Sequence, residues 1–480
     1  MTHEDTRYRR EPIDEAPGPV RATTFGEILH AYTKEEAMLE ADRCLRCAMP
    51  FCVQACPITQ DCRGYIALIA EGHFDEAATL TLQDNPLATV LCKTCYHYCE
   101  EDCVMGGKGV PIAIRHLKRA ALEFGKSDLL YVPSAPRSQR VAIIGGGPTG
   151  LMAAWELGLR GYSVTLFEMQ PFLGGQIDTI PKYHLEADDL DVDLARFRNI
   201  DCTFIVGKKS GSDFTPESLL QQGYLAVLVA IGASDPRALG IPGEHLPGVY
   251  YALPFLMAMN KGTDGLLGRK GRKIVVIGGG DVAMDAARSG LRLSEKGNVT
   301  VVYRKSRADM PAGPEELTES DEEGINFIFD RAPVQVLGTG SVEGIVVQAT
   351  QVGPPDARGR PTVTLVPGTA QTLPCDTIIV AAGEKADIEG LPNELDLGFA
   401  PQGWPEGKRP DWMTDVEGVF AAGGKSVVYA MAAGTRAAKA IDAYVQKKTA
   451  RPPIPRPDPL GRPTAAQLPS GYGGPTWHLD

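Results

Sequence analysis

Residues 140–168 read RVAIIGGGPTGLMAAWELGLRGYSVTLFE, and this stretch decides the fold of the chain. A short β-branched run gives way to a glycine-rich turn, an alanine- and leucine-rich segment, and a second β-branched run. This alternation predicts a β-α-β unit. The glycines follow the pattern G-x-G-x-x-G directly after the first strand, where a helix N-terminus can face a pyrophosphate.

Each position of this glycine pattern has a physical reason. Gly145 permits the tight turn, Gly147 lets the backbone approach the pyrophosphate, and Gly150 lets the helix pack closely on the strand. Glu168 ends the following strand, where a carboxylate can accept hydrogen bonds from ribose hydroxyls. The strand, the helix and the acid together predict dinucleotide binding rather than a purely structural turn.

A second copy of the unit lies at residues 273–304, KIVVIGGGDVAMDAARSGLRLSEKGNVTVVYR. Its pattern is G-x-G-x-x-A, and cations rather than an acid follow its second strand. A cation at that position can meet a 2′-phosphate, which favours NADPH over NADH, although a solvated basic turn would look the same. The residues concerned are Gly278, Gly280, Ala283, Arg304, Lys305 and Arg307.

Two dinucleotide folds in one chain imply two dinucleotides. If these are FAD and NAD(P)H, a hydride passes from nicotinamide to flavin, and the protein aligns the two rings and excludes water. That chemistry requires no acid or base side chain, so we expect no catalytic residue of this kind.

Cysteines are concentrated before the first glycine turn. Residues 44–57 read CLRCAMPFCVQACP, and residues 91–103 read LCKTCYHYCEEDC. Disulfides, zinc and iron–sulfur clusters are the three alternatives. Zinc sites usually take their ligands as two closely spaced pairs. Three thiols close together in the sequence, with a fourth far away, suit a cubane cluster instead. Because the thiol before a proline ligates the other cluster in ferredoxin-type runs, we expect Cys44, Cys47 and Cys52 in one [4Fe–4S] cluster and Cys56 in a second.

Composition and hydropathy narrow the class of protein. The length of 480 residues predicts more than one domain, and a net charge of −12 argues against a nucleic-acid partner. The longest apolar run, YLAVLVAIGA, is too short to span a bilayer, and the first residues contain no apolar leader. We therefore expect a cytoplasmic protein, in which disulfides are rare. Cys202 and Cys375 are expected to be small buried side chains.

Several motifs together resemble one known family. They are ADRCLRCAMPFCVQACP, CYHYCEEDC, IGGGPTG, LGGQ, AIGASDPRALGIPGE, IGGGDVAMDAAR, YRKSRADMPA and the closing GVFAAGG…AAGTRAA. In this order they resemble the small subunit of glutamate synthase and its relatives, from about residue 36 to residue 444. Those relatives include the N-terminal half of dihydropyrimidine dehydrogenase and the large subunit of NADH-dependent ferredoxin–NADP oxidoreductase.

The resemblance implies an α/β fold in which an N-terminal helical two-cluster domain precedes two Rossmann-like domains. The expected limits are 1–135 for the cluster domain, 136–250 and 379–448 for the FAD domain, 251–378 for the NAD(P)H domain inserted in it, and 449–480 for a Pro-rich extended tail. Further implied FAD contacts are Pro148, Thr149, Gly174, Gly175, Gln176, Gly232, Gly423, Gly424 and Val428. Further implied NAD(P)H contacts are Asp281, Val282 and Gly383.

The resemblance also implies the cluster ligands. The first cluster would use Cys44, Cys47, Cys52 and Cys103, and the second Cys56, Cys95 and Cys99. In the relatives the eighth ligand is often Glu or Gln on the following helix, a position that falls near His116, and Cys92 is the rival. Cys62 has no role in the family, so a spare buried thiol is expected.

Two departures concern function. Gly424 replaces an Asp that usually meets the flavin ribityl chain, so backbone amides or Lys425 would act there, and the helix near Val428 would aim its positive end at the flavin. The stretch DNPLATVLCKTC differs from glutamate synthase small subunits, which favours another partner.

The expected function is an electron-transfer subunit. Electrons would pass between NAD(P)H, FAD and two [4Fe–4S] clusters, to or from a catalytic oxidoreductase subunit or a ferredoxin-like carrier in a hetero-oligomer. Alternatives are the glutamate synthase small subunit itself, a stand-alone flavin disulfide reductase, and a non-catalytic scaffold. The disulfide reductase would need a C-x-x-C within the nucleotide domains, where the sequence has none. The tail, with Tyr472 and Trp477, would dock on the partner or stay disordered.

Overall fold

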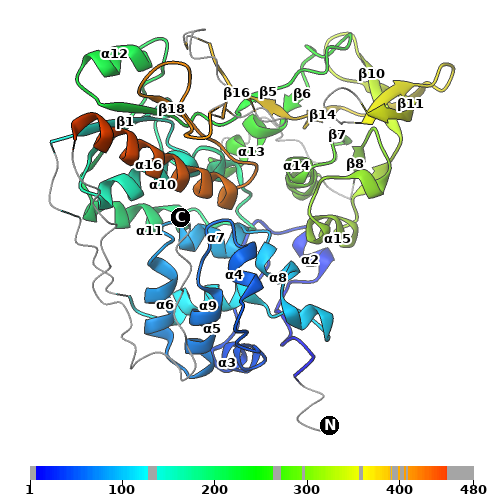
Figure 1. Cartoon of the computed structure of the whole chain (residues 1–480). Coiled ribbons are helices and arrows are strands. Elements are labelled where there is room, and N and C mark those ends of the chain that lie inside the picture. The colour runs from blue at the N-terminus through cyan, green and yellow to red at the C-terminus, as the bar shows by residue number, and fades with distance from the viewer. Residues whose placement is uncertain are drawn as a thin grey trace.

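The computed structural model describes residues 7–127, 134, 138–262, 272–294, 298–355, 361–389, 391, 398–399, 405–406 and 409–450. A helical domain, coloured blue to cyan in Figure 1, lies below two α/β units that stand side by side. The Pro-rich tail and its proposed docking lie outside the described residues. Within the described chain no helix is both long and apolar enough to cross a membrane.

The helical domain is built from short helices, most of which share one apolar core. Its helices are α2 (Gly18–Arg21), α3 (Lys34–Asp42), α4 (Phe51–Ala55), α5 (Cys62–Ala70), α6 (Phe74–Leu82), α7 (Ala88–Thr94), α8 (Tyr98–Glu101) and α9 (Ile114–Phe124). Helix α3 begins at a capping box, in which Thr33 and Glu36 satisfy each other's backbone amides. Cys44, Cys52, Cys99 and Cys103 pack against the core, so the thiols lie where the helices meet.

The first α/β unit is built on a fully parallel five-stranded sheet. Its order is β18 (Val419–Ala421), β4 (Ala226–Val229), β1 (Arg140–Ile144), β2 (Ser163–Glu168) and β3 (Cys202–Val206). Helix α10 (Pro148–Leu159) follows the first glycine turn and packs along α16 (Val427–Thr449). The last strand of this sheet is separated from the others by the whole second unit, so the first unit is interrupted in sequence.

The second unit carries its own parallel five-stranded sheet. Its order is β6 (Val249–Tyr251), β14 (Thr377–Val380), β7 (Ile274–Ile277), β8 (Val299–Val302) and β9 (Asn326–Ile328). Helices α13 (Ala252–Asn260), α14 (Asp281–Leu293) and α15 (Pro314–Glu322) belong to the same unit. The expected limits at 251 and 378 fall within β6 and β14.

An antiparallel sheet extends this second unit, and the sequence analysis did not foresee it. Its strands are β10 (Arg331–Leu337), β11 (Gly344–Pro355), β12 (Pro361–Leu365) and β13 (Gln371–Pro374). In the sequence, its strands lie between β9 and β14. The chain passes from one unit to the other twice. A short antiparallel pair, β5 (Asp235–Pro236) with β15 (Glu384–Lys385), joins these two connecting segments.

An N-terminal strap, residues 15–28, ties the helical domain to the second unit. The guanidinium of Arg21 is 2 % exposed and pairs with Glu322 at 2.5 Å. Arg292 donates to the carbonyl of Thr24 at 2.7 Å. Gly18 lies so close to α15 that a Cβ there would come within 2.3 Å of the Glu322 carbonyl oxygen. The strap therefore fixes how the second unit sits on the helical domain.

Candidate cofactor site

The first glycine turn has the close contacts that its sequence pattern predicts. Gly145 has a φ of +115°, and a Cβ there would lie 2.3 Å from the Ala230 carbonyl oxygen. A Cβ on Gly150 would lie 1.9 Å from the Gly145 carbonyl oxygen. A Cβ on Gly147 would meet no atom closer than 3.9 Å. Two glycines thus let the turn close, and the third leaves its outer side open to a ligand.

Glu168 also shapes this turn. Its carboxylate is buried and accepts hydrogen bonds from the amides of Gly146 and Gln170, both at 2.7 Å. Each carboxylate oxygen has a second lone pair, so both can still accept from a ribose hydroxyl. Glu168 therefore orders the turn and remains available as a ligand contact.

The second glycine turn repeats the geometry. Gly278 has a φ of +154°, and a Cβ there would lie 2.3 Å from the Ala381 carbonyl oxygen. Asp281 begins α14, and its Oδ1 accepts from the amide of Gly313 at 2.8 Å. The N-terminus of α14 thus faces the same side of its sheet as the N-terminus of α10 does in the first unit.

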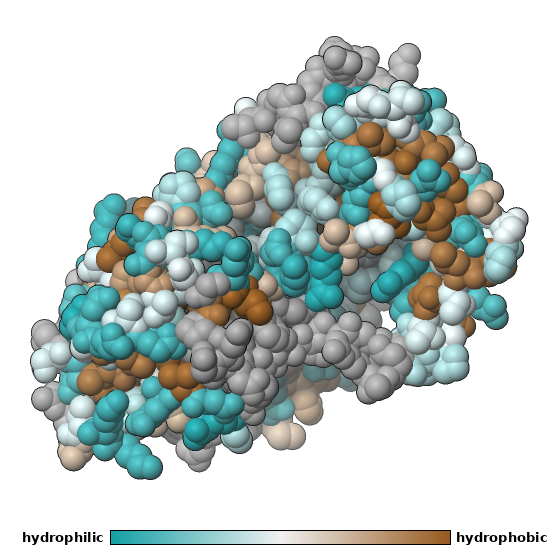
Figure 2. All heavy atoms as spheres, turned by 90° about the horizontal axis from the view of Figure 1, so that it is seen from above, coloured by the Kyte–Doolittle hydropathy of each residue, from teal (hydrophilic) through white to brown (hydrophobic). Residues whose placement is uncertain are grey.

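One cavity of about 1130 Å³ is lined by both glycine turns. Seen from above, the two units form two lobes with a hollow between them (Figure 2). Predicted contacts that line the cavity are Gly145, Gly147, Pro148, Thr149, Glu168, Gly175, Gln176, Gly232, Gly423, Gly424, Gly280, Asp281, Val282, Arg304 and Gly383. The other predicted contacts do not line it: Gly150, Gly174, Val428, Gly278, Ala283, Lys305 and Arg307. The volume exceeds the usual range for one drug-sized ligand, as two adjoining dinucleotides require.

The three cations after β8 have different surroundings. Arg304 lines the cavity. Arg307 pairs with Asp321 and lies over the Phe327 ring at 5.3 Å, so its charge is engaged outside the cavity. Lys305 accepts a hydrogen bond from the Asp330 amide through its carbonyl. Of the three, only Arg304 faces the cavity.

Strand order indicates which residues would hold each half of a dinucleotide. In the first unit, the turn after β1 would hold a pyrophosphate, and Glu168 at the end of β2 would hold the adenosine ribose. Gly232 and Gly424, which follow β4 and β18, line the same cavity and would hold the other half. In the second unit, Arg304 would lie at the adenosine end and Gly383 at the other end.

The helical domain contributes to this cavity as well, which the sequence did not reveal. Thr94 and Tyr96 line it, and the Tyr96 ring and the Asp281 carboxylate both lie beside Gly313. Burial raises the pKa of the Tyr96 phenol, so the hydroxyl stays protonated. The segment between two predicted cluster ligands therefore reaches the cavity beside the second glycine turn.

Lys425 lines the cavity beside Gly424. Its ammonium lies 4.5 Å from the centroid of the Tyr429 ring and 5.7 Å from that of the Tyr98 ring. The two rings meet edge to face at 5.3 Å. Tyr98 precedes a predicted cluster ligand, so this cation–aromatic group connects the thiol segment to the cavity wall at Gly424.

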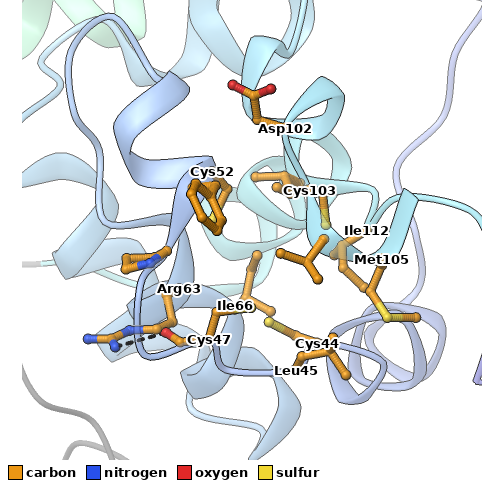
Figure 3. A pocket seen from close by; sticks show the side chains of 14 residues that line it. Cys44, Leu45, Cys47, Cys52, Arg63, Ile66, Asp102, Cys103, Met105 and Ile112 are labelled. Atoms are coloured by element: carbon orange, nitrogen blue, oxygen red, sulfur yellow. Dashed lines mark hydrogen bonds between the residues drawn. The ribbon is translucent and has the colours of Figure 1, made fainter. Parts of the chain in front are cut away.

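Four predicted ligands surround a hollow in the helical domain (Figure 3). Cys44, Cys47, Cys52 and Cys103 line it together, and these four thiols are also electrostatic neighbours of one another. Figure 3 shows Cys44 and Cys103 on opposite sides of the hollow and Asp102 pointing away from it. The rest of the lining is largely apolar: Leu45, Pro50, Phe51, Ile66, Val104, Met105, Ile112 and Ile114. Four thiols in a largely apolar hollow are a donor set that suits [4Fe–4S].

A second group of thiols gathers beside the first. Cys56, Cys95 and Cys99 are electrostatic neighbours, and burial raises the pKa of the Cys56 thiol. Lys118 is 6 % exposed and lies close enough to Cys56 to lower its pKa. Among the described residues no carboxylate forms an ion pair with Lys118. A buried cation beside three thiols is what a negatively charged cluster would need.

The two candidates for an eighth ligand lie on neighbouring helices. His116 on α9 is 4 % exposed and tilts against the Tyr32 ring at 5.8 Å. Burial holds the pKa of its imidazole well below the usual value, which is the neutral form that can ligate metal. Cys92 on α7 donates its thiol hydrogen to the Thr89 carbonyl at 3.1 Å. Within the described contacts His116 has no hydrogen-bond partner, whereas Cys92 has one.

A charged cluster surrounds Asp285 at the edge of the cavity. Asp285 lines the cavity, and His184 Nε2 lies 3.2 Å from Glu316 and 3.8 Å from Asp285. The buried Arg288 guanidinium lies 2.8 Å from Glu316 and 3.2 Å from the same His184 nitrogen. A guanidinium at that distance repels a metal cation, so this group is a network of ion pairs between the two units.

Comparison with known proteins adds the family. Residues 21–128 match the family described as dihydropyrimidine dehydrogenase domain II, 4Fe-4S cluster. Residues 139–440 match the pyridine nucleotide-disulphide oxidoreductase family. The boundary between the two matches coincides with the passage from the thiol domain to the first glycine turn.

Curated relatives cover most of the chain. It is 34 % identical over 440 residues to NADP(+)-dependent formate dehydrogenase subunit beta of Moorella thermoacetica, covering 84 % of this chain but only 61 % of that protein. It is 34 % identical over 389 residues to the glutamate synthase [NADPH] small chain of Halomonas elongata, covering 78 % and 82 %. The corresponding Escherichia coli chain is 32 % identical over 455 residues, covering 88 % and 95 %.

A solved structure shares the fold of the nucleotide units. Mycobacterium tuberculosis FprA in complex with NADPH has a TM-score of 0.54 and 20 % identity, covering 66 % of this chain and 88 % of that one. At this identity the likeness shows the fold alone. With the thiol domain and the two glycine turns, the sequence matches establish that this chain belongs to the glutamate synthase small subunit-like family of electron-transferring oxidoreductases, whose cofactors are FAD, a nicotinamide dinucleotide and [4Fe–4S].

Proposed function

We propose that the protein is the electron-transfer subunit of a larger cytoplasmic oxidoreductase. It would exchange electrons between NADPH, FAD, two [4Fe–4S] clusters and a catalytic partner. The observation that carries the proposal is the shared cavity, which is lined by both glycine turns and by the thiol segment at Thr94 and Tyr96. Flavin converts the two-electron chemistry of nicotinamide into the one-electron chemistry of clusters. The chain itself aligns the two reactive halves and shields the thiol sites from water.

Two clusters are proposed because the thiols form two groups. Cys44, Cys47, Cys52 and Cys103 would hold the first cluster, and Cys56, Cys95 and Cys99 would hold three irons of the second. His116 would supply the eighth ligand, supported by its burial and its neutral imidazole. Iron content and cluster EPR of His116→Ala and Cys92→Ala decide between them, because only the ligand variant loses signal.

NADPH is proposed over NADH because Arg304 faces the cavity at the adenosine end. A guanidinium there can hold a 2′-phosphate through two hydrogen bonds. The names of the formate dehydrogenase and glutamate synthase relatives, which print NADP(+) and NADPH, favour the same coenzyme.

The partner is proposed to be a catalytic oxidoreductase subunit other than the glutamate synthase large subunit. The departure at residues 84–95, just before the second group of thiols, supports this choice. The second candidate is the glutamate synthase small subunit itself, favoured by relatives of that name. Copurification distinguishes them: recovery of a glutamate synthase large subunit would overturn the first choice.

Anoxic purification of the full chain tests the main proposal. We expect about one FAD and about eight irons per chain, four for each cluster. NADPH should bleach the flavin and reduce the clusters, and NADH should do so more weakly. A chain that binds FAD but is not bleached by either coenzyme would be a non-catalytic scaffold. A colourless preparation without labile sulfide would overturn the proposal altogether.

A flavin disulfide reductase is disfavoured by the placement of the remaining thiols. In the described part of the nucleotide units these are Cys202, the first residue of β3, and Cys375, which precedes β14. The two belong to different sheets, and neither lines the cavity. A reductase of that kind needs a thiol pair beside the flavin.

A further inference from the structure

Three consecutive residues between two predicted cluster ligands, Tyr96, His97 and Tyr98, reach both nucleotide units. The Tyr98 ring meets the Tyr429 ring of α16, in the first unit, edge to face with the centroids 5.3 Å apart. His97 Nε2 lies 3.0 Å from a carboxylate oxygen of Glu315 on α15, in the second unit. Tyr96 lines the cavity that both units share. The thiol segment of the helical domain therefore lies where the three parts of the molecule meet.

A backbone turn at His97 lets these neighbouring side chains reach different units. Helix α7 ends at Thr94, and α8 begins at Tyr98. Between them His97 has a φ of +39° and a ψ of +47°, a left-handed conformation that residues other than glycine rarely adopt. Such a conformation persists only where the surrounding structure holds it. The contacts with both units supply that support.

In the first unit, the loop before α16 has no room for a side chain at position 424. A Cβ on Gly424 would lie 2.3 Å from the amide nitrogen of Ala430 and 2.5 Å from the carbonyl carbon of Tyr429. Lys425, the next residue, lies over the Tyr429 ring at 4.5 Å and over the Tyr98 ring at 5.7 Å. The loop therefore folds back on the start of the helix, and its charged side chain contacts the thiol segment.

The thiol segment also divides between two apolar cores. Cys95 and Tyr98 pack against the core that contains the sheet of the first unit, whereas Cys99 packs against the core of the helical domain. An edge-to-face pair of rings is a favoured geometry, and a tyrosine loses little conformational freedom when it is held. The position of the second thiol group relative to the first unit therefore depends on the contact between Tyr98 and Tyr429.

We propose that Tyr98 and Tyr429 are positioning residues for the transfer of single electrons between the flavin and the second cluster. The pair holds the thiol segment against the loop at Lys425, and this role rests on the two-cluster function proposed above. A hydride from NADPH brings two electrons to the flavin. These electrons leave singly, one for each cluster, and the remaining proton passes to water. No bond to either tyrosine forms or breaks.

Stopped-flow reduction of the anoxic full-length protein by NADPH tests this role, because flavin bleaching and cluster reduction can be followed separately. In Tyr429→Leu we expect wild-type iron content and flavin bleaching at the wild-type rate. Cluster reduction should be slowed about tenfold, since a displacement of about 1 Å between reacting groups can cost up to about a hundredfold in rate. Tyr429→Phe keeps the ring and should keep both rates.

Hydrogen–deuterium exchange of the same oxidised holoprotein reports the position of the segment without electron flow. The amides of residues 96–101 should lose protection in Tyr429→Leu, while those of α14 keep it. Tyr98→Leu should slow cluster reduction to the same extent. The variant with both substitutions should be no slower than either single variant, because both changes remove the same contact.

Tyr444→Leu is the matched control. Tyr444 lies on the same helix, its ring meets the Phe420 ring edge to face at 5.6 Å, and the Lys448 ammonium lies over it at 5.2 Å. Both rates should equal those of the wild type in this variant.

Cluster reduction at the wild-type rate in Tyr429→Leu would overturn the positioning role. Equal slowing of both phases would also overturn it, because Tyr429 would then act on flavin or coenzyme binding. Loss of iron from Tyr429→Leu would overturn it as well and make the ring pair a support for cluster assembly. A wild-type protein whose flavin is bleached without any reduction of clusters would instead refute the electron-transfer function itself.

Discussion

At the scale of single residues, the two cations Arg304 and Lys425 were not equally predictable from the sequence. Arg304 could be predicted, because it follows a strand of a dinucleotide unit at a fixed distance. The setting of Lys425 against Tyr98 could not be predicted, because 327 positions separate the two residues and only the fold brings them together.

Lys425 is expected to raise the reduction potential of the flavin. A cation at the flavin end of the cavity stabilises the reduced anion electrostatically. In Lys425→Met we expect bound FAD to become about tenfold harder to reduce, which is about 30 mV for a two-electron couple, measured by dye-equilibrated titration. Lys448→Met is the control. Lys448 contacts Tyr444 near the C-terminal end of α16, whereas Lys425 contacts Tyr429 near the start of that helix. Equal potentials in the two variants would show that Lys425 has no such role.

Arg304 is expected to select the coenzyme. Hydrogen bonds to charged groups contribute about 1.5–3 kcal/mol, so Arg304→Ala should raise the KM for NADPH roughly tenfold or more. The KM for NADH should change little, because NADH lacks the 2′-phosphate. Steady-state reduction of an artificial acceptor measures both constants. Arg307→Ala, which removes a cation already paired with Asp321, should leave them unchanged.

At the scale of elements, local patterns were predictable and insertions were not. Both β-α-β units could be predicted because their glycine spacing is a local requirement of the turn. The sheet β10–β13 was missed. Its strands are largely half-buried or exposed, as in β12 and β13, so they lack the apolar runs that identified the parallel strands. The sequence could predict which thiols belong to each of the two groups. It could not predict that Tyr96 lies near Asp281, because only the packing of the helices brings the two residues together.

The contact between α10 and α16 depends on Gly434. A Cβ there would lie 2.3 Å from the Thr149 carbonyl oxygen and 3.1 Å from the Ala153 amide nitrogen. Gly434→Ala should therefore force the helices apart, at a cost of about 1–3 kcal/mol, and weaken FAD retention through the displaced Thr149. Thermal unfolding and flavin content after gel filtration measure the two effects. Gly340→Ala, a glycine with no atom within 4 Å of the added Cβ, should be neutral.

At the scale of the whole molecule, buried charges join the parts. Arg21 of the strap pairs with Glu15, Glu322 and Glu323. Removing one partner of a buried ion pair costs about 3–5 kcal/mol, so Arg21→Met should lower stability and slow flavin reduction by NADPH as the second unit loosens. Stopped-flow reduction and thermal unfolding check both. In Arg307→Met, which breaks an exposed pair on the same unit, both values should stay close to the wild type.

The charged cluster between the units predicts a pH dependence. The groups that face Asp285 are His184, Tyr183, Glu316, Arg288, Asp281 and, from the helical domain, Tyr96. Burial and Glu316 raise the pKa of Asp285 to about 8, and Glu316 raises the pKa of His184. Both groups bind more protons in the folded state than in the unfolded state, so stability should fall as the pH rises from about 6.5 to about 8.

Asp285→Asn tests this sign. It removes one of the two contributions, so the unfolding temperature of the anoxic holoprotein should fall less steeply over the same pH range. Asp411→Asn, which alters an exposed pair with Arg409, should keep the wild-type slope. An unchanged or steeper slope in Asp285→Asn would contradict the raised pKa of this carboxyl.

The strap has a consequence for how the chain is made. Arg21 leaves the ribosome early, but its acceptor Glu322 follows 301 positions later. At translation speeds of about 5–20 residues per second, the arginine waits roughly 15–60 seconds without its partner. During synthesis the helical domain must therefore persist, or be protected, without the Arg21–Glu322 ion pair. The helical domain can dock on the second unit only late in synthesis. The rate of translation before residue 322 can therefore affect the yield of correctly assembled protein.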